Sequence, residues 1–360
     1  MTTNIVLIGT GSLARAFCYS IANAKFLVKK RIKVVIVGRD IEKVKKISVI
    51  ANSRAAITST DILFIPKEAS FDSEASIENI ITKFTPKIVL QMASLQSPWE
   101  FNNQKSTWVS LINNSGFALT IPFQAFLTIK LARIIKKTGL SIHFVNACYP
   151  DLVNPILKFL GYNVTCGVGN VSIIESVIRS VKNSYRKMNI SILGHHVHLT
   201  QKTNIPLEYR KPRVWGDDIN YDLVDLALNQ IRSIKDDELN QLTGLISAQT
   251  ILNLLKPEYT LYNIPGPNGL PGGYPVLMSS QGVILNLPNK ISEEEAVLWN
   301  LECSKYDGAS IDKDGFIKFN RLVSGALKQN NIKHFKGFYC EDIDNVCNDF
   351  ISLREHLREE

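Results

Sequence analysis

The sequence lacks the features that mark a secreted, disulfide-stapled or membrane-spanning protein. Its six cysteines include no Cys-x-x-Cys pair, and the first residues show neither the basic segment nor the cleavage site of a signal peptide. Apolar runs are interrupted by Asn, Gly or Pro within about ten residues, which is too short to cross a bilayer. We therefore expect a cytoplasmic protein with reduced thiols and no membrane segment.

The chain also lacks a concentrated basic stripe, although its net charge is +8. Lys and Arg are spread along the whole chain, whereas nucleic-acid-binding proteins more often concentrate them on one face. A weak general attraction of anionic cofactors and substrates is enough to account for this charge. We expect a small-molecule substrate and no nucleic-acid partner.

Apolar strand patterns alternate with helical patterns through the first 150 residues, which is typical of a parallel sheet with crossover helices. Strands are predicted at residues 5–8, 32–37, 61–65, 87–91 and 140–145. The second half mixes helices and strands. The predicted fold class is therefore α/β, with an N-terminal Rossmann parallel sheet and a second, mixed α+β domain.

The length of 360 residues suits two domains. We assign residues 1–150 to a NAD(P)-binding Rossmann domain and residues 151–306 to a substrate-binding and catalytic α+β domain. Residues 307–360 form a C-terminal extension whose last helix carries an apolar stripe. We expect this extension to pack on the second domain.

A glycine-rich loop separates the first predicted strand from its helix. Gly9, Gly11 and Ala14 match the Gly-x-Gly-x-x-Gly/Ala pattern of dinucleotide-binding folds, in the required position between strand and helix. The glycines permit a tight turn and a close approach of the backbone to a pyrophosphate, while helix N-terminal amides bind the phosphates. We predict that Gly9, Gly11, Ser12 and Leu13 bind the cofactor.

The end of the second strand indicates which dinucleotide binds. NAD enzymes place an acidic residue there to bind the ribose 2′-hydroxyl. This chain has Gly38 at that position, followed by Arg39, whose guanidinium can bind a 2′-phosphate. We therefore predict NADP(H) as the cofactor. The alternative is that Arg39 is merely solvated, and Asp40 is expected to cap the next helix in either case.

Several segments of the second half occur in a recognisable order. They read SIHFVNACYPDLVNPIL at residues 141–157, GVGN at 167–170, ILGHH at 192–196 and GYPVLMSSQGVI at 273–284. Their order and spacing resemble the lactate/malate dehydrogenase superfamily over roughly residues 4–305. The resemblance implies a Rossmann domain followed by an α/β catalytic domain, dehydrogenase activity and assembly into homo-oligomers.

By this resemblance, His196 takes the place of the family's acid/base histidine, with His198 as a second catalytic candidate. An imidazole can exchange a proton near neutral pH. The family's aspartate and substrate-binding arginine would fall on Ile173 and Ser176. Glu175, one helical turn before an arginine, is our candidate for the missing carboxylate. The alternative is that it forms an ordinary surface i,i+4 ion pair.

Two strand ends and one loop add to the predicted site. Ser94 and Asn146 follow predicted core strands at the edge where such sheets bind ligands, so we predict that they contact the cofactor or substrate. The loop at residues 94–108 corresponds to the family's mobile loop but contains no arginine. The substrate is therefore expected to be larger than a simple 2-oxo acid, or not a free 2-hydroxy acid.

These observations predict an NADP(H)-dependent oxidoreductase that transfers hydride to or from a carbonyl, imine or alcohol. No metal-binding residue is assigned. One alternative is a glycosidase-like or lyase-like enzyme that uses bound nucleotide and a metal, because GVGN also resembles a segment of the NAD-dependent family 4 glycoside hydrolases. Cys166 with His196 or His198 would then be the candidate metal ligands. A non-catalytic nucleotide-binding partner protein is the other alternative.

Overall fold

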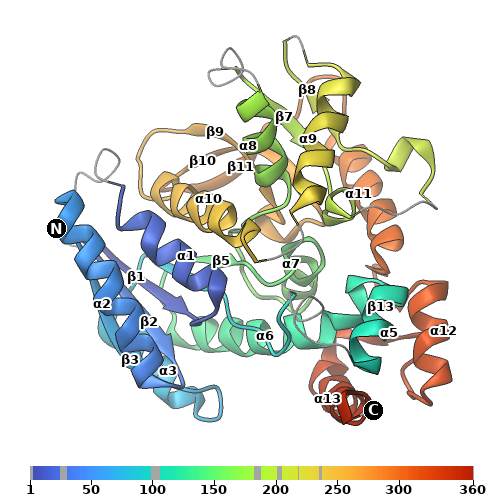
Figure 1. Cartoon of the computed structure of the whole chain (residues 1–360), viewed down its shortest axis with the longest axis horizontal. Helices are drawn as coiled ribbons and strands as arrows, with labels where there is room; N and C mark the ends of the chain where they lie inside the picture. Colours follow the sequence, from blue (N-terminus) through green and yellow to red (C-terminus); the bar gives the residue numbers. More distant parts are fainter. Residues whose placement is uncertain are drawn as a thin grey trace.

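The computed structural model describes residues 3–24, 31–98, 106–181, 188–200, 205–217, 219–234 and 237–359. The first half builds a six-stranded parallel sheet in the order β3-β2-β1-β4-β5-β6 (Figure 1). Its strands are β1 Thr3–Ile8, β2 Ile32–Gly38, β3 Ile62–Glu68, β4 Ile88–Gln91, β5 His143–Asn146 and β6 Cys166–Gly167. The order reverses between β1 and β4, which opens a crevice beyond the carboxyl ends of the strands.

Both faces of this sheet are buried, as the near-continuous apolar strands require. Ile5 and Leu7 of β1 join one core cluster, whereas Val6 and Ile8 join the other. Helices α1 and α2 contribute to the first cluster, and α3, α6 and α7 to the second. These helices are α1 Ser12–Ile21, α2 Ile41–Thr58, α3 Glu74–Phe84, α6 Ile121–Thr138 and α7 Pro150–Phe159. The predicted Rossmann sheet is thus confirmed.

Helix α6, with the 3-10 turn before it, forms a long apolar segment. Within the described residues, Phe117–Thr138 is the one segment long and apolar enough to cross a membrane by length and composition. The sequence prediction that no segment meets this criterion was therefore too strict. However, 78% of its most apolar window is buried inside the protein, as expected of a core helix.

The second half is a mixed α+β unit, as predicted. An antiparallel sheet in the order β11-β10-β9 packs near α10 and α11, and a two-stranded ribbon pairs β7 with β8. The elements are α8 Val171–Val181, β7 Ser191–Leu193, η3 His196–Leu199, η4 Leu207–Tyr209, β8 Arg213–Trp215, α9 Tyr221–Ser233, α10 Leu239–Asn253, β9 Thr260–Pro265, η5 Pro267–Gly269, β10 Gly273–Ser279, β11 Gly282–Leu285 and α11 Glu293–Asp307.

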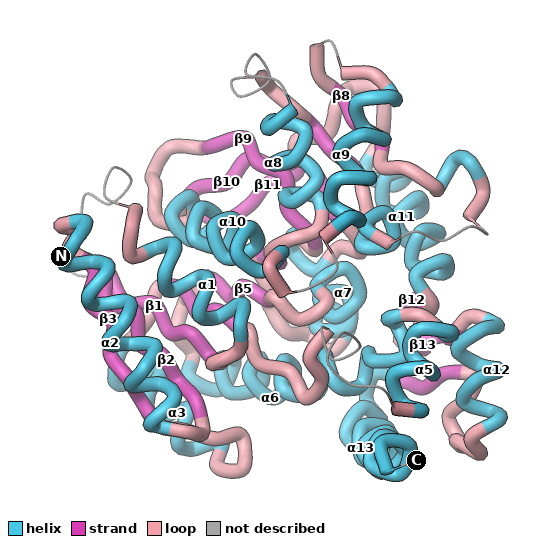
Figure 2. The backbone as a smooth tube through the Cα atoms, in the orientation of Figure 1, coloured by secondary structure: helices cyan, strands magenta, loops and turns pink. Residues whose placement is uncertain are grey.

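Helix α10 joins the two halves by lying directly against α1 (Figure 2). Gly244 of α10 makes this close approach possible. A Cβ built there would lie 2.5 Å from the carbonyl carbon of Ala16 in α1. The helix that begins at the glycine-rich loop is therefore braced from the second half of the chain.

The C-terminal extension contacts the predicted second domain, through α7 and α11, and also the first half of the chain. Its elements are β12 Ala309–Ile311, β13 Phe316–Phe319, α12 Arg321–Gln329, β14 Gly337–Tyr339, η6 Cys340–Asp342 and α13 Ile343–Glu359. Helix α13 packs on α6 and on α5 Thr107–Ser115 of the first half (Figure 1). Phe350 meets Phe123 of α6 with ring centroids 6.2 Å apart, and Arg354 covers that phenyl ring. The apolar stripe on α13 was predicted, but such a stripe does not show which element of the fold will pack against it.

Candidate active site

The glycine-rich loop has the geometry of an anion cradle. Gly9 has φ +130°, and a Cβ built there would lie 2.9 Å from the carbonyl carbon and oxygen of Met92, so the turn needs glycine. Gly11 is the N-cap of α1 and brings no capping side chain, and a Cβ there would meet nothing within 4 Å. Space therefore remains beside Gly11 at the helix N-terminus, the position at which dinucleotide-binding folds hold a pyrophosphate.

The neighbours of the loop hold it rigidly. Ser12, the first residue of α1, accepts a hydrogen bond at Oγ from Asn240 Nδ2 of α10 at 2.8 Å. Ala14 is buried and packs in the core beneath the helix, while Leu13 is partly exposed. The small residue in the last position of the motif thus has the packing role that the pattern predicts.

The end of β2 leaves no room for the carboxylate found in NAD-binding proteins. A Cβ built on Gly38 would lie 2.6 Å from Cγ2 of Thr10, so the threonine methyl group occupies the place where an acidic side chain would begin. Arg39 is exposed next to it. Asp40 caps α2 by accepting a hydrogen bond from the amide of Lys43 at 3.0 Å, as expected.

The ends of β4 and β5 lie at the same edge of the sheet as this loop. The polar side chains there form hydrogen bonds within the turns that follow the two strands. Asn146 is fully buried, donates to the carbonyl of Cys148 and to Asn154, and accepts from the amide of Cys148. In this conformation it fixes the turn, and its contact with cofactor or substrate stays a prediction. Ser94 is partly exposed and donates to the carbonyl of Gln96 at 2.7 Å, so its cofactor contact stays a prediction. Residues 99–105 of the loop without arginine lie outside the described residues.

His196 is the histidine whose geometry suits proton transfer. It begins η3, directly after the backbone bridge that pairs Gly194 with Gly273. Its Nδ1 lies 2.9 Å from Oδ2 of Asp307, and its backbone amide donates to Asp151 at 2.9 Å. Its side chain keeps 20% of its surface exposed. Because a carboxylate accepts at Nδ1, the imidazole carries its proton there in the neutral form, and Nε2 is left as the acid/base atom.

Aromatic rings enclose the His196 ring. Phe117 of η1 Phe117–Thr120 lies 5.1 Å away between ring centroids, tilted by 35°. Tyr149, just before α7, meets the imidazole edge-on at 5.4 Å and also donates its hydroxyl hydrogen to Asp307. These contacts limit rotation of the imidazole, so its two nitrogens keep distinct roles.

The carboxylate beside His196 is Asp307, and not Glu175 as we predicted. Glu175 pairs with Arg179 at 2.7 Å and accepts from Asn263, which in turn bonds the carbonyl of Ile190. The structure therefore contains the i,i+4 ion pair of the predicted alternative, but this pair is largely buried and not on the surface. Glu175 is also buried, which raises its pKa. It ties α8 to β9 and to the chain entering β7.

The sequence did not predict Asp307 as a site residue, because it belongs to no local motif. It is the last residue of α11, fully buried, and 111 positions from His196. One signal was present in the sequence: a carboxylate in the last turn of a helix opposes the helix dipole, so such a residue needs another reason to be there. Its contacts with His196 and Tyr149 supply that reason.

His198 is a structural residue, which corrects our second catalytic candidate. It is fully buried, its Nδ1 accepts the amide hydrogen of His195 at 2.8 Å, and its Nε2 donates to the carbonyl of Tyr209 at 3.1 Å. Burial lowers the pKa of His198 to about 3, so the ring stays neutral at physiological pH. With both nitrogens bonded to backbone, it shapes η3 rather than moving protons.

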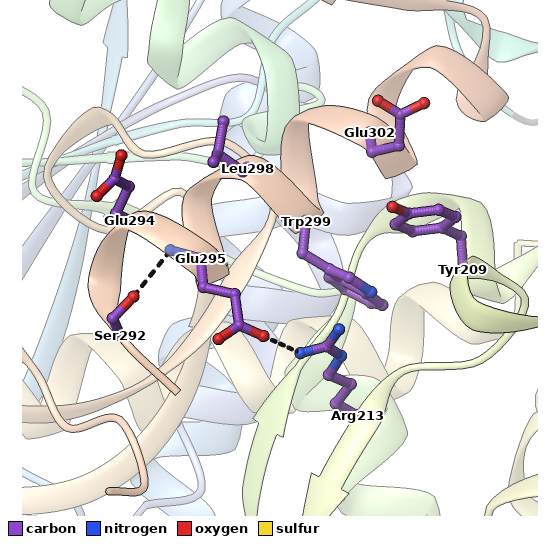
Figure 3. Close-up of a pocket in the computed structure, with 8 residues that line it drawn as sticks. All are labelled: Tyr209, Arg213, Ser292, Glu294, Glu295, Leu298, Trp299 and Glu302. Carbon is purple, nitrogen blue, oxygen red and sulfur yellow. Dashed lines mark hydrogen bonds and ion pairs between the residues drawn. The ribbon is translucent and has the colours of Figure 1, made fainter. Parts of the chain in front are cut away.

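A surface hollow lies on the far side of His198 from the site. It has a volume of about 450 Å³ and is lined by residues of β8, η4 and α11, among them Arg213, Tyr209 and Trp299 (Figure 3). Trp299 separates it from the site, because its indole stacks on His198 at 5.5 Å. Arg213 and Glu295 form an ion pair across the hollow at 2.8 Å. We assign it no part in the chemistry.

The residues considered for a metal do not form a centre. In the part of the chain that the structure describes, no three or more His, Cys, Asp or Glu side chains are grouped so that they could hold an ion. Cys166 is fully buried, and burial raises the pKa of its thiol, which disfavours the thiolate that binds metals. The geometry therefore gives the metal-dependent alternative no support.

Comparison with known proteins shows that this chain shares its fold with solved structures. No protein-family model matches the sequence, and a search of curated proteins finds no match. Among solved structures, a Cryptosporidium parvum lactate dehydrogenase complexed with lactic acid and nicotinamide adenine dinucleotide is 14% identical, with a TM-score of 0.55 over 84% of this chain and 95% of that one.

Two malate dehydrogenases are similar to the same degree. That of Plasmodium falciparum is 14% identical, with a TM-score of 0.55 over 96% of this chain and 99% of that one. That of Archaeoglobus fulgidus, in complex with NADH, is 12% identical, with a TM-score of 0.56 over 84% and 96%. These identities are low, so the similarity shows the fold: the lactate/malate dehydrogenase fold that the sequence resemblance implied.

Proposed function

We propose that this protein, which has the lactate/malate dehydrogenase fold, is an NADP(H)-dependent oxidoreductase with His196 as its acid/base residue. The observation that carries the proposal is the buried Asp307 carboxylate at Nδ1 of a partly exposed imidazole. The glycine loop before α1 supplies a place for the dinucleotide phosphates, and the structurally similar enzymes include complexes with nicotinamide nucleotides.

Each residue of the site has a distinct role in the proposed reaction. A bound nicotinamide would supply or accept the hydride. In the reductive direction, protonated His196 gives the Nε2 proton to the oxygen or nitrogen of the substrate, and in the oxidative direction neutral Nε2 takes it back. Asp307 holds the imidazole in orientation and stabilises its protonated form. Phe117 packs against the ring.

Nucleotide titration followed by nicotinamide fluorescence tests the cofactor. We expect NADPH to bind at least tenfold more tightly than NADH, because the exposed Arg39 guanidinium can bond the 2′-phosphate while Thr10 covers Gly38. Arg39→Ser should weaken NADPH binding by roughly tenfold or more, the effect of a charge-assisted hydrogen bond, and leave NADH binding unchanged.

A matched control removes the same charge elsewhere. Arg321 begins α12 in the C-terminal extension and is also exposed, so Arg321→Ser should leave both affinities unchanged. Tighter binding of NADH than of NADPH would refute the Arg39 assignment while keeping the dehydrogenase proposal. Absence of binding by either nucleotide would refute the proposal as a whole.

The charges beside His196 indicate which substrates are favoured. Asp151 and Asp307 are both fully buried and both bond this residue. Protonated His196 offsets the charge of one of them. A substrate carboxylate about 8 Å from the remaining charge is disfavoured by roughly 2 kcal/mol at an effective dielectric constant of about 20. We expect pyruvamide to be reduced with a kcat/KM roughly tenfold or more above that of pyruvate. Faster reduction of pyruvate would contradict this expectation.

A further inference from the structure

Two hydrogen-bond donors converge on one oxygen atom in the candidate active site. Oδ2 of Asp307 accepts from the hydroxyl of Tyr149 and also lies 2.9 Å from Nδ1 of His196. The three residues come from distant elements: the segment before α7, the start of η3 and the end of α11. The carboxylate is thus shared between the imidazole and a phenol.

Tyr149 is fixed in this position by its backbone as well as by its ring. It has φ +46°, a left-handed conformation that aromatic residues seldom adopt, and it precedes Pro150 at the first turn of α7. Its ring is buried and meets Phe117 edge-on at 5.0 Å. A backbone held in this sparsely populated region indicates that the surrounding contacts fix Tyr149 in place.

The shared oxygen has a definite electrostatic consequence. A hydrogen bond from a phenol draws negative charge from the carboxylate oxygen, so less charge remains to stabilise a protonated imidazole at the same atom. Burial and the neighbouring charge of Asp307 raise the pKa of Tyr149 well above its usual value. The phenol therefore keeps its proton and donates over the whole working pH range.

We propose that Tyr149 is a positioning residue that acts through Asp307 to lower the proton affinity of His196. This role rests on the proposed function, in which His196 exchanges a proton with substrate. The hydroxyl and the imidazole compete for Oδ2 of Asp307, so the strength of the phenol bond sets the pH at which His196 changes from proton donor to proton acceptor.

Other ionisable groups surround the same segment and stay in place when the phenol is removed. Asp151 of α7 accepts from the His196 amide, and Nδ1 of His195 lies 3.9 Å from Oδ2 of Asp307. His198 of η3 is buried, and Arg232 of α9 donates to its carbonyl at 2.7 Å. Since Tyr149→Phe alters none of these groups, a change in the titration of His196 reports the phenol bond.

Histidine titration by NMR tests the proposal on the full chain without nucleotide. The chain has six histidines, and the His196 resonance is the one lost in His196→Gln. We expect Tyr149→Phe to raise the proton affinity of His196 about threefold to tenfold, the effect of losing one hydrogen bond to the paired carboxylate. An unchanged or lowered proton affinity would overturn the proposal.

A double-mutant cycle separates this effect from a general disturbance. Asp307→Asn should lower the proton affinity of His196, and in that background Tyr149→Phe should have no further effect. Equal effects of Tyr149→Phe with and without Asp307 would refute action through the carboxylate. Tyr262→Phe is the control, because Tyr262 is another tyrosine that is partly buried, and its hydroxyl lies 3.5 Å from the carbonyl of Ile246. It should leave His196 unchanged.

A variant of identical shape covers the case in which Tyr149→Phe does not fold. 3-Fluorotyrosine at position 149 is a stronger donor, so it should lower the proton affinity of His196; an increase would overturn the proposal. The titration needs no turnover, so its failure is distinct from a failure of the proposed function. Where turnover is measured, the His196 limb of the pH profile of kcat/KM should move by the same amount as the NMR titration.

Discussion

Replacement of His196 by glutamine is expected to lower kcat/KM about 10²–10⁴-fold, the contribution of a general acid/base group. Glutamine can still donate to Asp307 but cannot exchange a proton, so the packing around the site is kept. NADPH binding, measured by fluorescence, should be unchanged because the phosphate loop lies on α1. Asp307→Asn should also lower kcat/KM strongly with little effect on NADPH binding, since it removes the charge that stabilises protonated His196.

Two other histidines serve as controls for this result. His334 of the C-terminal extension is partly exposed and lies 3.7 Å from Asp349, so His334→Gln should leave turnover unchanged and change the free energy of unfolding only slightly. His198→Gln should lower the free energy of unfolding, because the two backbone bonds of this buried ring are lost. Retention of more than a third of the activity by a folded His196→Gln would remove this residue from the mechanism.

The parts of the site that the sequence predicted are those with local causes. The loop at Gly9 and Gly11 follows one strand and begins one helix, so a short motif carries its whole geometry. Asp40 caps α2 for a reason contained in four consecutive residues. His196 was chosen as a candidate because several weakly matching segments occur in the order of the resembled family.

The parts that the sequence missed depend on contacts between distant segments. Nothing near Asp307 in the sequence indicates that it reaches His196, because the folding of α11 and η3 against each other decides that contact. Glu175 was a reasonable choice by spacing, but Asn263 on β9 turns its carboxylate toward the second domain. The stripe on α13 showed that the helix is half buried but not that α6 covers it. Hydrophobic periodicity predicts which face of a helix is buried, but the topology of the fold decides which element packs against that face.

The second large effect is expected at the crossing of α1 and α10. Gly244→Ala places a methyl group 2.5–2.7 Å from backbone atoms of Ala16 and Phe17, which cannot move aside without moving α1. We expect the free energy of unfolding, measured by urea denaturation, to fall by roughly 2 kcal/mol or more, within the range of overpacked cores. NADPH binding should weaken as well, because α1 presents the phosphate-binding amides at its N-terminus.

The same substitution at Gly325 shows whether close packing, and not helix propensity, causes the loss of stability in Gly244→Ala. Gly325 lies inside helix α12, is exposed, and a Cβ built there would meet nothing within 4 Å. Gly325→Ala should therefore raise the free energy of unfolding by about 0.5–1 kcal/mol, the ordinary preference of a helix for alanine over glycine. The opposite signs at two helical glycines separate helix propensity from close packing. A neutral or stabilising Gly244→Ala would mean that α1 and α10 are not held in close contact, and that the phosphate loop is not braced by the second half of the chain.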